Sequence, residues 1–207
     1  MRTVKRHDDR KEELIDTAER LFRTKGYAAC TINDILREVA IAKGTFYHYF
    51  KSKEDVLDAM VDRYADRALA QVQDALAAAE GAAPAQRLLL AFQSMNVRQE
   101  FGDHLLEQMH AGENALLHQK SLSRMVMGMA PVLARIVEEG SQAGAWRCRH
   151  PLPYMQIFLA AALSLMDEGI FGMDDHTQQA LLPALISALE KLLEVPDNTF
   201  LSMFSGT

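Results

Sequence analysis

The sequence predicts an all-α protein, and two observations carry this prediction. Apolar residues recur at three- and four-residue steps along nearly the whole chain, which is the spacing of α-helices with one buried face. No strand pattern longer than four residues is present. The chain has 207 residues, of which 49% are hydrophobic, so it can bury a core as one domain or as two small ones.

Two short helices are expected first, each with its own end signals. The first covers residues 9–25, and Gly26 favours a stop directly after it. The second opens at Thr31, whose hydroxyl can accept a hydrogen bond from a first-turn amide. Asp34 stands three residues further on, where a carboxylate can complete a capping box.

The remaining chain is also predicted to be helical. A third short helix covers 43–50, and a helix without a breaker covers 53–79, a rod about 40 Å long at about 1.5 Å per residue. The last dozen residues are expected to form a loose tail after Pro196. Further helices are predicted between Pro84 and Gly102 and over 103–111, 120–139, 151–171 and 177–194, with a turn over 140–144.

Charge is distributed unevenly along the chain. The net charge is −6, yet residues 1–53 hold 12 Lys and Arg against 8 Asp and Glu. Residues 54–207 hold 10 against 20. A basic block joined to an acidic remainder indicates an anion-binding module followed by a body with another task. The predicted domains are therefore 1–52 and 53–207.

Several other classes of protein do not fit this sequence. The longest apolar stretch, Ile157 to Met166, has ten residues, whereas a membrane span needs about 20. The N-terminus is polar and lacks the apolar segment of a signal peptide. Cys30 and Cys148 are too few for a disulfide framework or a zinc site. We therefore expect a cytoplasmic protein that contacts no membrane and needs no cofactor.

The third helix has a composition suited to reading DNA. Phe46 and Phe50 fall on one face, which can pack on the first two helices. Lys43, Tyr47 and His48 can then point outward, and they supply a cation and hydrogen-bonding rings. Three short helices with a tight connection before the last describe a helix-turn-helix, whose last helix enters the DNA major groove.

These segments resemble the TetR family of bacterial transcriptional repressors. Residues 43–54 resemble its recognition helix running into its linking helix, and residues 18–27 and 31–35 resemble the end of its first helix and the start of its second. The resemblance covers about residues 9–60. It implies that the following positions contact DNA, the tyrosines often through phosphates: Thr31, Lys43, Gly44, Thr45, Tyr47, His48, Tyr49 and Lys53.

Two positions depart from the family's pattern. Ala40 stands where the turn usually has a glycine, which costs about 1 kcal/mol if the backbone there is left-handed. Ala42 stands where a capping serine is usual, so a hydroxyl that could cap the third helix or contact a phosphate is missing. The arginines and lysines before residue 12 are interpreted equally well as a solvated end or as a DNA-binding arm.

The helices 151–171 and 177–194 are the most apolar ones. The stripe on the second is wider than one intrachain contact needs. Burial inside a single bundle is one interpretation, and a two-fold four-helix interface with a second copy, as the resemblance implies, is the other. We favour the homodimer, because a lone helix-turn-helix reads too few bases for operator specificity.

Nine of the eleven methionines lie after residue 90. Methionine fills cores, and it also lines broad apolar cavities. In TetR-like proteins such a cavity lies between the linking helix and the dimer pair, so the resemblance implies an effector site there. The candidate wall is Phe92, Met95, Leu105, Met109, Met125, Met129, Trp146, Phe158 and Met166, with His110 as a hydrogen-bonding group.

His104, Glu107 and His110 follow one another at three-residue steps. Metal ligands have such side chains, but the six-residue span turns through about 240° of helical arc. A polar stripe is therefore the preferred interpretation, and no metal site is predicted.

The sequence thus predicts a ligand-responsive transcriptional regulator. We expect a repressor that leaves a palindromic double-stranded operator when a small, mainly apolar molecule binds the C-terminal domain. The alternative is a DNA-bound adaptor of the same fold that recruits a protein partner. An enzyme is not expected, because no nucleophile triad, phosphate-binding glycine loop or metal-spaced cluster is present.

Overall fold

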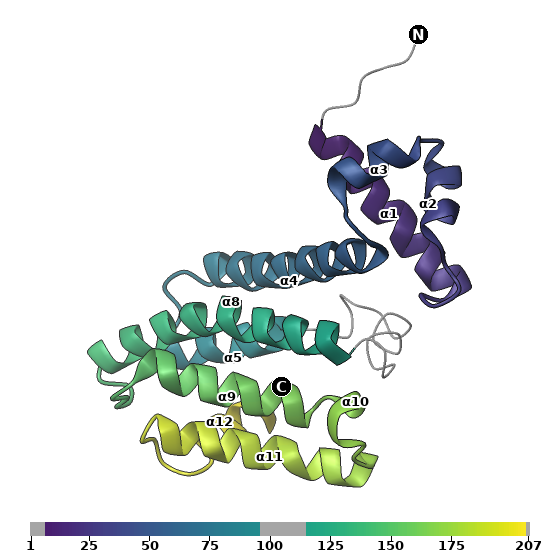
Figure 1. The fold of residues 1–207 in the computed structure, drawn as a ribbon. Coiled ribbons are helices and arrows are strands. Elements are labelled where there is room, and N and C mark those ends of the chain that lie inside the picture. The colour runs from purple at the N-terminus through teal and green to yellow at the C-terminus, as the bar shows by residue number, and fades with distance from the viewer. Residues whose placement is uncertain (1–6, 96–114, 206–207) are drawn as a thin grey trace. The chain divides into compact units, whose positions relative to one another are not determined.

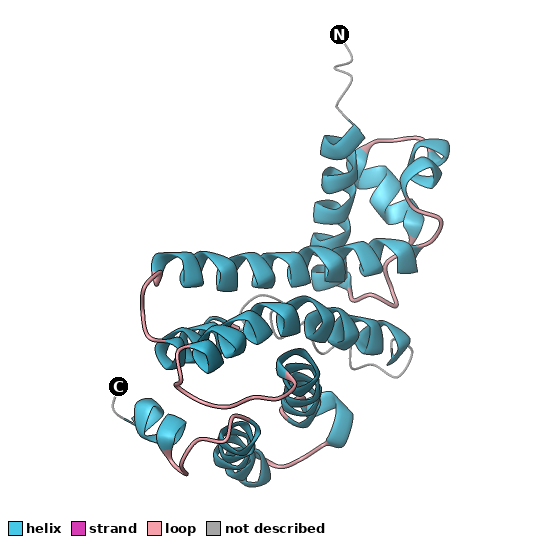
Figure 2. Cartoon of the chain, turned by 90° about the vertical axis from the view of Figure 1, so that its left-hand side faces the viewer, coloured by secondary structure: helices cyan, strands magenta, loops and turns pink. Residues whose placement is uncertain are grey.

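The computed structural model describes residues 7–95 and 115–205 (Figure 1). Within these two ranges every regular element is an α-helix, as Figure 2 shows, and the all-α prediction is confirmed. The described residues divide into two compact units, 7–64 with 115–117, and 65–95 with 118–205. None of the helices in these ranges is both long and apolar enough to cross a membrane.

The first unit holds three short helices and the start of a long one. These are α1 (His7–Lys25), α2 (Ile32–Val39), α3 (Lys43–Tyr49) and α4 (Lys53–Ala78). α1 packs on α2, and α2 packs on α3. The predicted boundary between residues 52 and 53 coincides with the start of α4, and its functional meaning stays a prediction. The core of this unit includes Leu14, Ala18, Phe22, Ile35, Phe46, Leu57 and Met60.

Arg63 ties α4 to α1. Its side chain is only 12% exposed, and its guanidinium donates to Glu12 at 3.1 Å, Asp16 at 2.5 Å and Glu19 at 2.5 Å. The hydroxyl of Tyr64 donates to the same Glu19 carboxylate at 2.5 Å. The first three turns of α4 are therefore held in one unit with α1 by charge-assisted hydrogen bonds.

The second unit is a helical body around one apolar core. After the end of α4 it contains α5 (Pro84–Ser94), α8 (Ala115–Gln142), α9 (Pro151–Leu165), α10 (Glu168–Phe171), α11 (Asp175–Leu192) and α12 (Thr199–Ser205). α11 packs against both α9 and α12 (Figure 1). Leu88, Met129, Leu133, Ile136, Met155 and Leu159 are its largest fully buried side chains.

The prediction of a loose tail after Pro196 is wrong. Thr199–Ser205 form α12, and Phe200 is 2% exposed. The cause is Glu190, a buried carboxylate that accepts hydrogen bonds from the backbone amides of Asn198 at 3.0 Å and Phe200 at 2.8 Å. A carboxylate at the start of a helix satisfies its free amides and matches its dipole.

The single helix predicted over 151–171 is interrupted. α9 ends at Leu165, and α10 starts again at Glu168. Asp167 and Gly169 are both poor helix formers, which accounts for a break at this point. α11 then begins after Asp174, whose carboxylate accepts from the amide of Thr177 at 2.7 Å.

The turn predicted over 140–144 begins later than expected, because α8 runs on to Gln142. Gly140 is buried inside this helix against the indole of Trp146. The indole Nε1 donates to the carbonyl oxygen of Val137 at 2.8 Å, which holds the ring against this end of the helix. The chain reverses at Gly144, which has a φ of +73°.

Candidate nucleic-acid interface

The start of α2 is fixed by a complete capping box. The amide of Asp34 donates to the Thr31 hydroxyl at 3.2 Å, and the Asp34 carboxylate accepts from the Thr31 amide at 2.9 Å and the Thr31 hydroxyl at 2.7 Å. Lys25 adds an ion pair to the same carboxylate at 3.0 Å. Hydrogen bonds from Thr31, followed by the one from Lys25, hold the pKa of Asp34 well below its usual range. The entry to the helix-turn-helix is therefore set by local polar contacts.

The turn between α2 and α3 passes through Ala40. Its φ of 55° and ψ of 47° are left-handed, and its amide donates to the carbonyl of Leu36. A left-handed backbone at a residue with a Cβ is strained. Ala42, the N-cap of α3, makes no side-chain capping bond. Both departures from the family's pattern therefore leave this turn less stable than it could be.

Replacing Ala40 with glycine is expected to stabilise the protein. The left-handed conformation costs an alanine about 1–2 kcal/mol and a glycine almost nothing, although glycine also loses more entropy on folding. Chemical denaturation should show that the free energy of unfolding of Ala40→Gly is about 0.5–1 kcal/mol higher than that of the wild-type protein. As a control, Ala70→Gly in the exposed middle of α4 should lose about 1 kcal/mol. A loss of stability in both variants would contradict the left-handed conformation at Ala40.

α3 buries one face and exposes the other. Phe46 is fully buried and Phe50 is 4% exposed, and their rings are 5.9 Å apart. Tyr47 is 45% exposed, which is unusual for so large an aromatic side chain. The ammonium of Lys43 lies 5.8 Å from the centre of the Tyr47 ring, one helical turn away.

The other predicted positions on α3 are accessible to different degrees. Gly44 and His48 are exposed, whereas Thr45 and Tyr49 are half-buried. A Cβ placed on Gly44 would meet no atom within 4 Å, so this turn of the helix is open to a close neighbour. The rings of His48 and Tyr49 contact each other edge to face at 5.1 Å. The exposed face of α3 thus combines a cation, hydrogen-bonding rings and an open backbone.

Lys53 has a different position from the rest of the predicted set. Its ammonium donates to the carbonyl oxygens of Tyr27 at 2.7 Å and Cys30 at 2.9 Å. It also lies 4.1 Å from the centre of the Tyr27 ring. The donors of Lys53 are therefore directed into the first unit, where they join the start of α4 to the turn before α2.

Local surroundings raise the pKa of both the Tyr27 hydroxyl and the Cys30 thiol. Tyr27 donates to Glu54 at 3.2 Å, and burial together with the charge of Glu54 raises the pKa of Tyr27. Cys30 is 1% exposed, and burial, followed by the nearby Asp34, raises the pKa of its thiol. A reactive cysteine requires the opposite shift.

The second unit contains an apolar cavity of about 320 Å³ between α5, α9, α11 and α12. Of the predicted effector residues, Phe92, Met95, Phe158 and Met166 line it. Met125, Met129 and Trp146 are buried in the core and are not part of this wall. Leu105, Met109 and His110 lie outside the described residues, as do His104 and Glu107. Residues that the sequence did not suggest complete the wall, among them Leu163, Leu182, Leu185, Ile186, Leu189 and Phe200.

Apolar side chains are also exposed along α9, α10 and α11. Ile157 is 61% exposed, Phe171 is 55% exposed and Leu182 is 51% exposed. Such exposure on consecutive helices is typical of a surface that is covered in an assembly. Leu152, Met166 and Ile170 belong to the same set.

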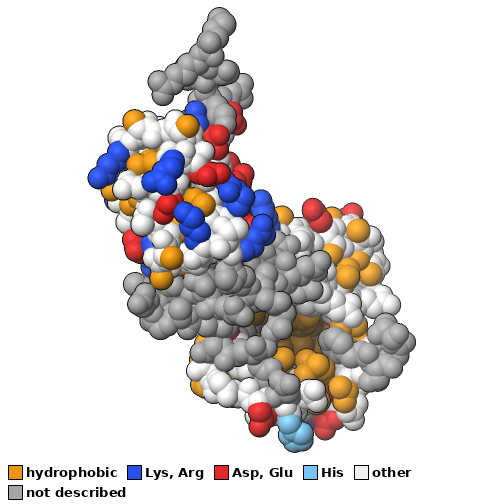
Figure 3. All heavy atoms as spheres, turned by 90° about the vertical axis from the view of Figure 1, so that its right-hand side faces the viewer, with side chains coloured by type: hydrophobic (Ala, Val, Ile, Leu, Met, Phe, Trp, Pro, Cys, Tyr) orange, Lys and Arg blue, Asp and Glu red, His pale blue; other side chains and the backbone are white. Residues whose placement is uncertain are grey.

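The two kinds of surface are visible in Figure 3. Lys and Arg side chains gather over the first unit in this view, whereas apolar side chains line a recess of the second unit. Among the side chains that the structure describes, no three His, Cys, Asp or Glu residues are grouped so as to hold a metal ion.

A helix-turn-helix unit followed by a helical body with an apolar cavity defines a class of DNA-binding regulatory proteins. Two family models match consecutive parts of the chain. Residues 14–60 match the bacterial regulatory proteins of the tetR family, and residues 98–187 match the tetracyclin repressor-like C-terminal domain. The chain belongs to the TetR family of bacterial regulatory proteins.

Relatives with curated names are similar mainly over the N-terminal part. The transcriptional regulator YerO of Bacillus subtilis is 47% identical over 57 residues, which are 28% of this chain and 20% of that protein. EthR of Mycolicibacterium smegmatis is 41% identical over 61 residues, 30% of this chain and 28% of that protein. The chain thus matches only about a quarter of the length of these relatives. The fatty acid metabolism regulator protein of Bacillus subtilis is 25% identical over 135 residues, 64% of this chain and 68% of that protein.

Solved structures share the fold along nearly the whole chain. A putative TetR-family regulator from Syntrophomonas wolfei has a TM-score of 0.62 at 20% identity, covering 90% of this chain and 96% of that one. Escherichia coli NemR in its reduced form has a TM-score of 0.58 at 22% identity, covering 90% and 98%. At these identities the similarity establishes the fold alone.

Proposed function

We propose that the protein is a DNA-binding transcriptional regulator whose operator affinity is controlled by a small, mainly apolar molecule. The observation that carries this proposal is the division of α3 into a fully buried Phe46 and an exposed face with Lys43 and Tyr47. Packing alone does not require an exposed tyrosine beside a lysine, whereas insertion into the major groove does benefit from both.

The residues of this surface are assigned different roles in the proposal. Lys43, Tyr47 and His48 contact base edges or phosphates, and Gly44 lets the backbone approach the DNA closely. Thr45 and Tyr49, which are half-buried, add phosphate contacts at the edges of the helix. Thr31 and Lys53 act through the placement of α2 and α4, since their side-chain donors are engaged within the unit.

A homodimer is part of the proposal. The exposed apolar side chains of α9, α10 and α11 give each copy a surface that a second copy would cover. A two-fold axis would then place two copies of α3 about 34–36 Å apart, in successive major grooves of a palindromic operator.

The apolar cavity is proposed to hold the effector. All of its described lining side chains are apolar, so a ligand there needs a hydrocarbon body and gains little from charge. A volume of about 320 Å³ is near the lower limit of ordinary ligand pockets. One relative whose similarity extends beyond the DNA-binding part is named a fatty acid metabolism regulator protein, which supports an aliphatic effector.

Regulation is proposed to work by release. The ligand-free dimer blocks transcription, and the bound ligand favours a form with lower operator affinity. A coupling free energy of about 1–3 kcal/mol corresponds to 5- to 150-fold weaker binding. The adaptor alternative, in which the body recruits a protein, is less favoured because the apolar cavity lies between helices and offers a small molecule more contact than a protein surface.

Selection from sheared genomic DNA tests the DNA-binding part of the proposal. The purified protein should enrich fragments that share an inverted repeat whose half-sites are one helical turn, or a multiple of it, apart. The affinity for such a fragment should fall steeply with salt, because phosphate contacts release counterions. Enrichment of no common sequence would contradict the proposal.

Native mass spectrometry of the purified protein tests the effector part. We expect either an empty dimer or one that retains an apolar small molecule, and adding the extracted molecule should weaken operator binding at least fivefold. A retained protein partner, with no effect of any extracted molecule on DNA binding, would favour the adaptor.

A further inference from the structure

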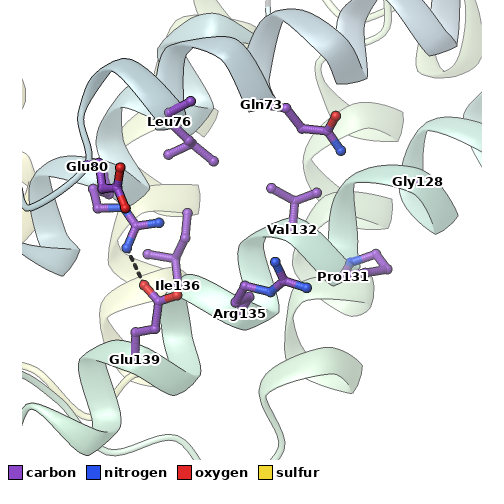
Figure 4. A pocket seen from close by; sticks show the side chains of 11 residues that line it. Gln73, Leu76, Glu80, Gly128, Pro131, Val132, Arg135, Ile136 and Glu139 are labelled. Carbon is purple, nitrogen blue, oxygen red and sulfur yellow. Dashed lines mark hydrogen bonds and ion pairs between the residues drawn. The ribbon is translucent and has the colours of Figure 1, made fainter.

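A groove of about 820 Å³ lies in the second unit between α4, α5 and α8 (Figure 4). It shares no lining residue with the apolar cavity, which lies between α5, α9, α11 and α12. The two sites also differ in chemistry, because the groove contains two arginines and two glutamates besides its apolar residues. The groove is therefore a separate place at which a ligand of another kind can bind.

The charges of this groove leave one cation without a partner. Arg135 and Glu139 stand four residues apart on α8, where they would ordinarily pair with each other. Glu139 instead forms an ion pair with Arg87 of α5. Within the part of the chain that the structure describes, Arg135 makes no ion pair or hydrogen bond, and it is exposed. Figure 4 shows its guanidinium beside Val132, among the side chains that line the groove.

The floor beside Arg135 is apolar. Leu76 is 8% exposed and Ile136 is 1% exposed, and Val132 is half-buried between them and the rim. Gln73 of α4 lies on the other side of Val132 from Arg135, with its carboxamide directed into the groove (Figure 4). An unpaired guanidinium, an amide donor and an apolar floor suit a molecule with an anionic head and a hydrocarbon body.

We propose that the groove binds a small organic monocarboxylate. Arg135 receives the carboxylate through its fork of N–H donors, and Gln73 lines the opposite side of the groove from α4. The hydrocarbon body covers Leu76, Val132 and Ile136. A second negative charge on the ligand is disfavoured, because Glu80 and Glu139 line the groove as well. This binding site shares no residue with the effector cavity or with the proposed DNA-binding surface.

Calorimetric titration with biphenyl-4-carboxylate and its uncharged amide tests the proposal. The wild-type protein should bind the carboxylate more tightly than the amide. Arg135→Gln should weaken binding of the carboxylate about tenfold or more and leave binding of the amide unchanged, since only the charged hydrogen bonds are lost. Arg124→Gln is the matched control, because this exposed arginine is on the same helix and does not line the groove.

A second variant separates the two sites. Leu185→Trp fills the apolar cavity and should leave binding of the carboxylate as in the wild-type protein. Loss of binding in Leu185→Trp but not in Arg135→Gln would place the probe in the apolar cavity and overturn the proposal. Equal binding of acid and amide, or no binding of either, would also overturn it, and neither result bears on operator selection.

Discussion

Tyr47→Ala is expected to weaken binding to a selected operator by about 10- to 100-fold, a loss of about 1.4–2.8 kcal/mol per site. The Tyr47 ring is 45% exposed on α3, next to the ammonium of Lys43. Truncation removes a hydrogen-bonding ring at the proposed DNA surface and leaves Phe46 and the core of the unit in place. A gel-shift titration with the selected fragment measures the change in affinity.

Three further variants make this result specific. Tyr47→Phe keeps the ring and removes the hydroxyl. The loss of operator affinity in this variant therefore reports the contribution of the hydroxyl's contact with a phosphate or base alone. Lys43→Ala should reduce both the affinity and the slope of its salt dependence. Lys191→Ala, an exposed lysine of the second unit, should change neither. An unaltered footprint in both Tyr47→Ala and Lys43→Ala, with the dimer intact in sedimentation, would refute the assignment of α3 to DNA.

Gly140→Ala is expected to destabilise the second unit by at least about 3 kcal/mol. A Cβ at this position would lie 2.1 Å from Cζ2 and 2.2 Å from Cε2 of Trp146. The indole is 5% exposed, is held by its hydrogen bond to Val137, and contacts the ring of Phe200 at 6.1 Å between centres. Neither the ring nor the helix backbone can move away without breaking these contacts. Thermal unfolding followed by far-ultraviolet circular dichroism measures the loss, and it also serves for variants that lack the single tryptophan.

Gly128→Ala provides the matched control on the same helix. The nearest atom to its added Cβ is Cδ2 of Leu69 at 3.8 Å, an ordinary contact. This variant should therefore gain up to about 1 kcal/mol from helix propensity. Replacing Trp146 with leucine in the Gly140→Ala background should recover part of the lost stability. Equal stabilities of the two glycine variants would show that the indole does not occupy this position.

The first unit was predictable because its signals are local. The Thr31 cap lies beside the helix that it starts, and the buried Phe46 follows from helical spacing alone. The direction of Lys53 was not predictable, because its acceptors are the carbonyl oxygens of Tyr27 and Cys30, more than twenty residues earlier. Every residue has a backbone carbonyl oxygen, so no sequence pattern can indicate which of them accepts a hydrogen bond from a lysine.

The second unit was less predictable because its contacts are distant. α12 depends on hydrogen bonds to Glu190, so the local composition after Pro196 predicted a tail instead of a helix. The helical Gly140 packs against Trp146, so the local composition predicted that the turn would begin at residue 140. The apolar stripe over 177–194 was assigned to a partner surface, yet Leu185 on this helix lines the cavity, because a stripe does not say which of its sides faces a cavity. The charged groove requires α5 and α8 to meet, and the pairing of Arg87 with Glu139 joins residues about fifty positions apart.

The ties between α4 and α1 bear on how chimaeric regulators should be assembled. Lys53 and Arg63 both belong to α4 by sequence, yet all their recorded partners lie in residues 12–30. A chimaera that replaces residues 1–52 with the DNA-binding residues of another regulator would separate Lys53 and Arg63 from their hydrogen-bond partners. A junction after Tyr64 transfers these donors and acceptors together. The exchanged part then keeps its own hydrogen bonds and ion pairs, and the junction falls within α4, beyond the residues that make them.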